Sequence, residues 1–240
     1  MEFRKLKAEE IDCRVAQIAS NYCTLLLYKD ARVDMNILDE TVGAMNWQKR
    51  YVRDNANCIV GIWDSEKNQW IEKEDTGTES FSEAEKGLAS DSFKRACFNW
   101  GIGRELYTAP TIMFFPHKDM TPKGQESEFF TTPNGKYTTK TRFYVDYIDY
   151  DGNNISDLVI RDHKGNSRFE QLTPGTQASF NKSFLELRKL IEQNEDKDES
   201  FDREEFYKYF NVSSDNQLNF KQRKEATDLL KKRLGKVESK

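Results

Sequence analysis

Apolar residues near the start of the chain predict a helix followed by a strand. Ile11, Val15 and Ile18 recur at helical spacing, so a first helix is expected over residues 6–20. The run YCTLLLY at residues 22–28 is rich in residues that favour sheets, so a strand is expected there.

Three strand-like segments follow a short helix that is expected over residues 35–42 and ends at Gly43. The three segments span residues 47–53, 57–64 and 69–75 and are separated by polar turn residues. Such short spacings are typical of an antiparallel meander.

One face of the first of these strands combines rings with cations. Residues at every second position share a face, so Trp47, Lys49, Tyr51 and Arg53 are expected to lie side by side. Rings stack on bases and cations neutralise phosphates, which makes this face a candidate for binding single-stranded nucleic acid. The alternative is an exposed strand face whose charges only keep the protein soluble.

An amphipathic helix is expected after the meander, within residues 80–107. Ser82 and Glu85 have the spacing of a capping box at its start. Gly101 and Gly103 are expected to end it as a C-terminal cap. Successive residues turn by about 100°, so one side collects apolar residues, namely Ala89, Phe93, Ala96, Cys97 and Trp100.

The other side of this helix carries Asp91 and the doublet of Lys94 and Arg95. Because the apolar side is expected to pack on the sheet, the doublet is left available for a ligand. A β-β-β-α unit with cations and aromatic rings suits a flexible polyanion, and single-stranded nucleic acid is the first candidate.

The second half of the chain predicts a loop, a hairpin and a helical end. Residues 120–135 contain two prolines and two glycines and are expected to form a loop. Asp151-Gly152 is a tight-turn dipeptide, so the segments around it are expected to pair as a hairpin, over residues 142–150 and 156–162. Further helices are expected over residues 184–193, 203–211 and 220–233.

Together these elements predict an α+β fold. Its β-β-β-α core is an antiparallel meander packed on a long helix, with an added β-hairpin and a small helical C-terminal module. The expected divisions are a core domain over residues 1–190, an acidic linker over residues 191–202 and the helical module over residues 203–240.

Composition narrows the classes of function. The four cysteines are scattered without a C-x-x-C pair and only two histidines occur, so the usual zinc spacings are excluded and neither a disulfide framework nor a histidine-based triad is expected. The phosphate loop G-x-x-x-x-G-K-[ST] is absent, and Gly101-Ile102-Gly103 does not continue into a dinucleotide-binding fingerprint. No cofactor and no metal are therefore expected.

Hydropathy and charge bear on location and partner. No apolar run approaches the roughly 20 residues of a membrane span, and the N-terminus lacks the apolar core of a signal peptide. A soluble, cytoplasmic protein without membrane contact is expected. The formal net charge of −4 opposes DNA binding, which usually needs a basic footprint, but acidic residues crowd residues 195–205 and leave the remainder near neutral or mildly basic.

The motifs of the core occur in a fixed order, which is Gly43-x-x-Asn46-Trp47, three strands, Asp75-x-Gly77-x-Glu79-Ser80, and then Asp91-Ser-Phe-Lys94-Arg95-Ala96-x-x-x-Trp100-Gly101. This order resembles the Rad-fifty-two superfamily of single-strand annealing proteins, in particular phage and prophage members of the Sak and DdrA kind. The resemblance covers residues 32–107. It implies the β-β-β-α core and a homo-oligomer in the form of a ring or a helical arc.

The resemblance also implies DNA-binding residues. In the superfamily, the lysine of the helix contacts the DNA backbone, and this position matches Lys94, with Arg95 beside it. An arginine that precedes the short helix is matched by Arg32 with a one-residue gap. The chain departs from the pattern at Phe98, where the superfamily carries a further basic residue.

Further DNA-binding candidates come from the residues themselves. Strand patterning adds Lys49, Arg50 and Arg53, and Arg104 is added because it lies beside the expected helix end. The expected function is ATP-independent binding of single-stranded DNA and annealing of complementary strands in homologous recombination or repair. The protein is not expected to be an enzyme. It is expected in the cytoplasm of a bacterial host, with a single-strand binding protein or a phage exonuclease as partner.

Two alternatives belong to other classes. Asp146, Asp149 and Asp151 would support a metal-dependent DNA-processing enzyme, although Asp is favoured at hairpin turns by geometry alone. A non-catalytic scaffold would dock a replication or recombination partner through the C-terminal helices and would be indifferent to the loss of Lys94.

Overall fold

The computed structural model describes residues 1–78, 84–116 and 128–237 and has an α+β fold, as predicted. The chain divides into two compact units. The first combines residues 1–12 with residues 27–109, and the second combines residues 13–26 with the chain from Pro110 onward.

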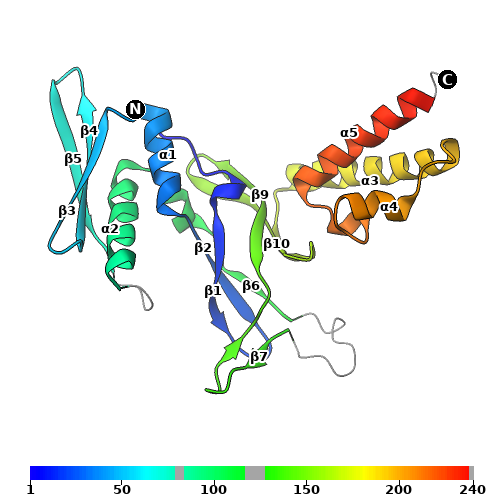
Figure 1. Cartoon of the computed structure of the whole chain (residues 1–240), viewed down its shortest axis with the longest axis horizontal. Coiled ribbons are helices and arrows are strands. Elements are labelled where there is room, and N and C mark those ends of the chain that lie inside the picture. Colours follow the sequence, from blue (N-terminus) through cyan, green and yellow to red (C-terminus); the bar gives the residue numbers. More distant parts are fainter. Residues whose placement is uncertain (79–83, 117–127, 238–240) are drawn as a thin grey trace. The chain divides into compact units, whose positions relative to one another are not determined.

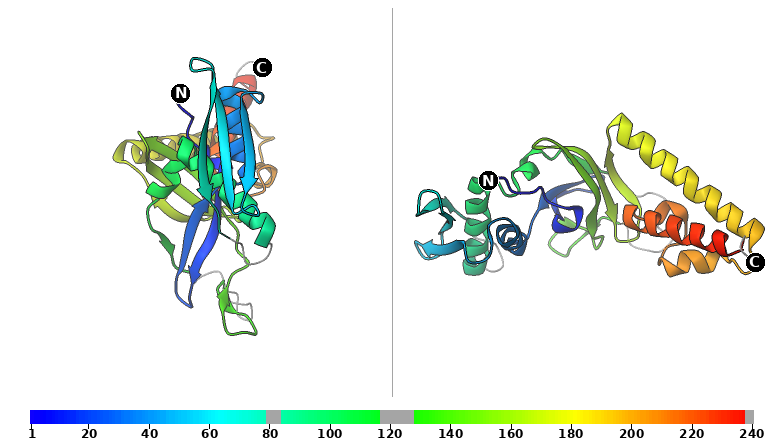
Figure 2. Two further views of the ribbon diagram at one scale, coloured as in Figure 1. Left: turned by 90° about the vertical axis from the view of Figure 1, so that its left-hand side faces the viewer. Right: turned by 90° about the horizontal axis from the view of Figure 1, so that it is seen from above.

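The first unit is a three-stranded antiparallel meander covered by two helices. Strands β3, β4 and β5 pair in chain order, and α2 packs on β4 and β5 with α1 beside it (Figures 1 and 2). The bounds are Ala31–Val42 for α1, Trp47–Val52 for β3, Asn57–Asp64 for β4, Gln69–Thr76 for β5 and Ala84–Trp100 for α2, with 3₁₀ turns at Ala8–Glu10 and Arg104–Thr108. This arrangement confirms the predicted β-β-β-α core.

A close approach of two backbones fixes α2 on the meander. The amide of Gly77, just after β5, donates to the carbonyl of Ala56 at 2.8 Å. A Cβ on Gly77 would lie 2.5 Å from the backbone nitrogen of Ser92 and 2.6 Å from the carbonyl oxygen of Leu88. Only glycine lets the chain cross the helix at this distance.

Polar contacts hold the same helix at its middle and at its C-terminal end. Near the middle, Asp91 accepts a hydrogen bond from the backbone of Thr78 at 2.9 Å, and the Ser92 hydroxyl donates to the carbonyl of Asn55 at 3.1 Å. At the C-terminal end, the indole of Trp100 donates to the carbonyl of Val60 at 3.0 Å. These contacts fix the rotation of α2 about its own axis.

The predicted end of α2 is confirmed. Gly101 and Gly103 have φ angles of +102° and +76°, which L side chains rarely adopt, and the amide of Ile102 donates to the carbonyl of Cys97. The capping box predicted at Ser82 lies outside the described residues.

The second unit is built on a six-stranded sheet in the order β11-β10-β9-β1-β2-β6. The predicted hairpin is β9 and β10, which pair antiparallel around Gly152. The bounds of the sheet strands are Asp12–Ile18 for β1, Cys23–Tyr28 for β2, Ile112–Phe114 for β6, Phe143–Asp151 for β9, Asn154–Asp162 for β10 and Ser167–Gln171 for β11. A separate two-stranded pair consists of β7 (Phe130–Thr131) and β8 (Tyr137–Thr138).

The predicted first helix is wrong. Residues 6–20 contain a 3₁₀ turn and then β1, and the expected apolar face is not buried as a whole, since Ile11 is buried but Val15 is 38% exposed. Pairing of β1 between β9 and β2 decides its conformation, and this long-range contact cannot be inferred from local spacing. The strand predicted over residues 22–28 is confirmed, whereas residues 120–127 of the expected loop over residues 120–135 lie outside the described residues and the rest of it contains β7.

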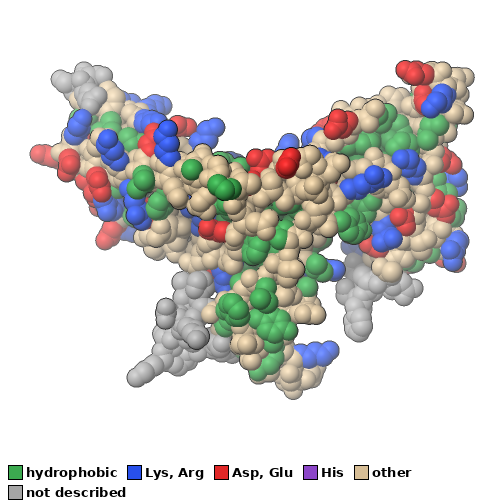
Figure 3. Space-filling view, turned by 180° about the vertical axis from the view of Figure 1, so that it is seen from behind, with side chains coloured by type: hydrophobic (Ala, Val, Ile, Leu, Met, Phe, Trp, Pro, Cys, Tyr) green, Lys and Arg blue, Asp and Glu red, His purple; other side chains and the backbone are tan. Residues whose placement is uncertain are grey.

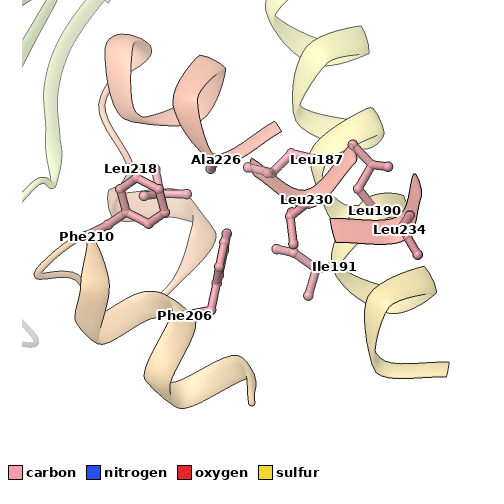
Figure 4. Packing of buried hydrophobic residues seen from close by; sticks show 9 residues of the cluster. All are labelled: Leu187, Leu190, Ile191, Phe206, Phe210, Leu218, Ala226, Leu230 and Leu234. Carbon is pink, nitrogen blue, oxygen red and sulfur yellow. The ribbon is translucent and has the colours of Figure 1, made fainter. Parts of the chain in front are cut away.

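Three helices form the end of the chain as far as it is described. They are α3 (Pro174–Lys197), α4 (Arg203–Tyr209) and α5 (Phe220–Val237), with a 3₁₀ turn at Asp215–Gln217. Their shared core consists of buried side chains from all three helices and the α4–α5 connection, shown in Figure 4, namely Leu187, Leu190, Ile191, Phe206, Phe210, Leu218, Ala226, Leu230 and Leu234. We call this part, from Leu187 to Val237, the helical module.

The structure differs from the expected acidic linker over residues 191–202. Helix α3 continues to Lys197, and Ile191 and Asn194 are buried in the helical module. The module is tied to the β9–β10 hairpin by Asp146, which forms an ion pair with Arg161 at 2.6 Å and accepts the backbone N–H of Phe220 at 2.8 Å. Within the described parts of the chain, no helix combines the length and apolar character needed to cross a membrane.

The contact at Gly77 predicts a measurable loss of stability. Gly77→Ala should lower the free energy of unfolding of the first unit by about 2 kcal/mol, because backbone atoms cannot move away from the added methyl group. Gly61→Ala is the matched control in the same meander, since its nearest neighbours are side-chain atoms at 3.4 Å or more. We expect that control to change stability by less than about 1 kcal/mol.

Tryptophan fluorescence during urea unfolding measures this effect in the first unit, because all four tryptophans of the chain lie there. A Gly77→Ala variant as stable as the wild type would contradict the account of how α2 is held.

Candidate nucleic-acid interface

A buried ion pair lies between α1 and α2. Lys29 and Asp34 are 1% and 0% exposed, and the ammonium of Lys29 donates to one carboxylate oxygen of Asp34 and lies 4.5 Å from the ring centre of Phe98. A side chain on Gly103 would collide with the Lys29 stem, so the second glycine of the helix end makes room for this lysine.

The carboxylate of Asp34 is held in an unusual state. Its second oxygen is buried and has no hydrogen-bond partner in the described structure. Burial raises the pKa of Asp34 to about 6, against the charge and hydrogen bond of Lys29, which lower it. The weaker influence of Lys94 also lowers it, which places the charge of Lys94 near this pair.

Two of the predicted DNA-binding residues act on a second carboxylate near this pair, that of Asp30. Arg32 is exposed and pairs with Asp30 at 2.9 Å. This contact lowers the pKa of Asp30, and the charge of Lys94 contributes in the same direction. Lys94 itself is half-buried and has no ion pair with any described residue. We call Arg32, Lys94 and Asp30 together the α1–α2 corner.

The predicted doublet divides between two sides of α2. Whereas the charge of Lys94 acts on Asp30 and Asp34, Arg95 forms an ion pair with Asp75 at the end of β5, at 3.3 Å. Asp75 is also bonded to the side-chain amide of Asn99. Arg95 is 43% exposed and therefore combines a structural contact with partial access to solvent.

The face of β3 that combines rings with cations is not free, contrary to the expectation that it can stack on bases. Trp47 stacks on Phe93 of α2 with ring centres 6.2 Å apart. The ammonium of Lys49 lies 4.4 Å from the centre of the same Phe93 ring and 5.9 Å from that of Tyr51. This face therefore packs against the helix.

The remaining predicted cations lie apart from the corner. Arg50 is on the opposite face of the meander and pairs with Glu72 at 2.9 Å. Arg53 is exposed in the β3–β4 turn with φ of 54°. Arg104 donates to the carbonyls of Phe98 and Asn99 at 2.5 and 2.8 Å, so it satisfies free carbonyls at the end of α2.

Two of the three acidic residues that would support a metal-dependent enzyme have other partners, and the third, Asp151, is exposed at the end of β9. Asp146 pairs with Arg161 and caps α5, whereas Asp149 accepts hydrogen bonds from the hydroxyl of Tyr147 and the backbone of Tyr150. In the parts of the chain that are described, no three His, Cys, Asp or Glu side chains are grouped so that they could hold a metal ion.

Sequence reasoning missed the buried pair of Lys29 and Asp34. The only sequence signal is a lysine that directly follows an apolar strand and precedes the short helix by one residue. From spacing alone, such a lysine would be interpreted as a solvated residue at the end of a strand.

Comparisons of the chain with protein-family models, with curated proteins and with solved structures find no match. The assignment of residues to a ligand therefore rests on the geometry of the first unit and on the order of motifs in the sequence.

The buried pair predicts strong coupling between two substitutions. Lys29→Met or Asp34→Ala alone should destabilise the first unit by about 3 kcal/mol, because each leaves one buried charge without a partner. The double variant should lie within about 1 kcal/mol of the wild type, since it removes both charges at once. Urea unfolding of the four proteins in a double-mutant cycle measures the coupling, and additive losses would show that the pair is not buried as described.

Proposed function

We propose that the chain binds single-stranded DNA through the α1–α2 corner and anneals complementary strands without ATP or metal. The observation that carries the proposal is that Arg32 pairs with Asp30, that the charge of Lys94 from a second helix also acts on this carboxylate, and that Lys94 has no ion pair with any described residue. Both residues also match positions to which the superfamily resemblance assigns DNA contacts.

The chemistry of the corner suits a phosphate. Arg32 presents a guanidinium, which binds phosphate through two parallel hydrogen bonds, while Lys94 adds a point charge with little freedom because it is half-buried. An arriving phosphate would compete with Asp30 for Arg32. Because the carboxylate of Asp30 is part-exposed, the exchange takes place in water and needs no burial of a new charge.

Contacts to phosphates carry no sequence information, so a protein that holds only the backbone accepts any sequence. The bases of the held strand then face outward and can sample a second strand. Duplex formation is downhill, since each stacking step is worth about 1.4 kcal/mol, so annealing needs no nucleotide hydrolysis.

Two cations per chain bind DNA weakly by themselves. A homo-oligomer, as a ring or a helical arc, would place one corner after another along a strand and so raise the affinity through multivalency. We include this assembly in the proposal, with the bacterial cytoplasm as its location and recombination or repair as its role.

The other cations have a different part in the proposal. Lys49, Arg50 and Arg104 are engaged by a ring, a carboxylate and backbone carbonyls, and we assign them to the stability of the core. Arg95 and Arg53 are partly or fully accessible, and we assign them secondary contacts to the DNA backbone.

The corner predicts a specific loss of DNA binding. Arg32→Ala/Lys94→Ala should weaken binding of a labelled oligothymidylate about tenfold or more in fluorescence anisotropy. The slope of log affinity against log salt should become shallower by about 1.4, since each phosphate contact on a single strand contributes about 0.7.

The matched control is Lys182→Ala/Lys189→Ala, which removes the same charge from exposed positions of α3. This variant should keep the affinity and the salt slope of the wild type. Absence of oligothymidylate binding by the wild type, or an unchanged slope in the corner variant, would refute the proposed site.

A further inference from the structure

The helical module carries a pocket between α4 and the C-terminal half of α5. Its volume is about 420 Å³. The floor is formed by Phe206 and Leu230, which are buried, and the walls by Phe201, Tyr209 and Leu229. Tyr209 is 67% exposed and Leu229 42% exposed, so large apolar surface remains in contact with water here. A pocket with this apolar lining can accommodate an aromatic or branched aliphatic side chain.

Cations line the α5 side of the pocket. Leu229, Lys232 and Lys236 follow each other at spacings of three and four residues and so lie on one face of the helix. Neither lysine has an ion pair with a described residue. The third cation, Arg233, is held in place by Asp198 at 2.5 Å and lies 5.3 Å from the ring centre of Phe201, which makes it part of the wall.

The same face of α5 extends beyond the pocket. A second, shallower hollow shares Leu229 and Lys232 with the first and adds Lys221 and Lys224. Figure 3 views the molecule from behind, and on that side Lys and Arg side chains of the helical module, at the left of the view, are interspersed with Asp and Glu side chains. Helix α5 carries seven Lys and Arg residues and two acids, Glu225 and Asp228, so it is the most basic helix of the module.

We propose that this surface binds an acidic peptide segment of another protein, with one large apolar side chain in the pocket and carboxylates on Lys232 and Lys236. The apolar floor provides affinity through burial, and the lysines provide selection by charge. The proposal goes beyond DNA binding and does not depend on it.

A nucleic-acid ligand fits this surface less well. The α4 wall contributes the carboxylates of Asp202 and Glu205, and Glu225 and Asp228 alternate with the lysines of α5. These acids would repel a backbone that carries a charge at every phosphate, whereas a peptide can place its carboxylates only where lysines occur. A phosphate backbone would also leave the apolar pocket empty.

The test uses the full chain and a fluorescein-labelled peptide of about ten residues, rich in Asp and Glu with a single central Phe. Two comparison peptides carry Ser in place of the Phe, or Asn and Gln in place of the acids. We expect the wild type to bind the first peptide at least about tenfold more tightly than either comparison peptide.

Two variants and a control locate the site. Lys232→Ser/Lys236→Ser should weaken binding of the first peptide about tenfold and reduce the salt dependence of that binding. Leu229→Ser should also weaken peptide binding, because it removes an apolar side chain from the wall of the pocket. Lys182→Ser/Lys189→Ser should bind like the wild type. Circular dichroism confirms that each variant is folded, and oligothymidylate binding should be the same in all of them.

Several results would overturn the proposal. Equal binding of the peptides with and without Phe would show that the pocket takes no anchor. Loss of oligothymidylate binding in Lys232→Ser/Lys236→Ser would make the surface a nucleic-acid site. A change of sedimentation coefficient in the same variant, without an effect on the peptide, would assign the surface to a second copy of this chain.

Discussion

The first unit depends on the close approach of two backbones at Gly77. Since the chain crosses α2 there with no room for a side chain, the helix cannot slide along or roll on the meander. Contacts from Asp91 to Thr78 and from Trp100 to Val60 fix the same rotation. It follows that neighbouring positions of α2 have different surroundings, since the charge of Lys94 acts on Asp30 and Asp34 whereas Arg95 pairs with Asp75 at the end of β5.

This constraint also explains why so few of the cations in the first unit are free to bind a polyanion. A meander covered by one helix uses its ring-and-cation face for packing, and the helix end uses an arginine to satisfy its last carbonyls. Among the predicted cations, what is left is Arg53 in the β3–β4 turn and the α1–α2 corner, next to the buried pair of Lys29 and Asp34. Asp30 holds Arg32 in the unbound protein, so the proposed DNA binding exchanges one anion for another at this arginine.

Local sequence signals were sufficient for the strands of the meander, the β9–β10 hairpin and the glycine end of α2, because turn residues and short-range periodicity determine them. They failed for β1, which lies in the sheet between the neighbouring strand β2 and β9, a strand far away in the chain. The candidate cations could be found from the sequence, but their partners could not. Helical spacing shows that Lys94 and Arg95 lie on the polar side of the helix. It does not show that α1 packs against α2 or that Asp75 lies within reach of Arg95.

The proposal of annealing is tested most directly by mixing two complementary dye-labelled oligonucleotides with the wild-type chain, without ATP and without divalent metal, and following energy transfer over time. The account predicts that the duplex forms much faster with the protein than without it. This acceleration of annealing should fall as the salt concentration is raised, because the protein holds the DNA by its phosphates. Annealing at the spontaneous rate, with DNA either unbound or bound and sequestered, would contradict it.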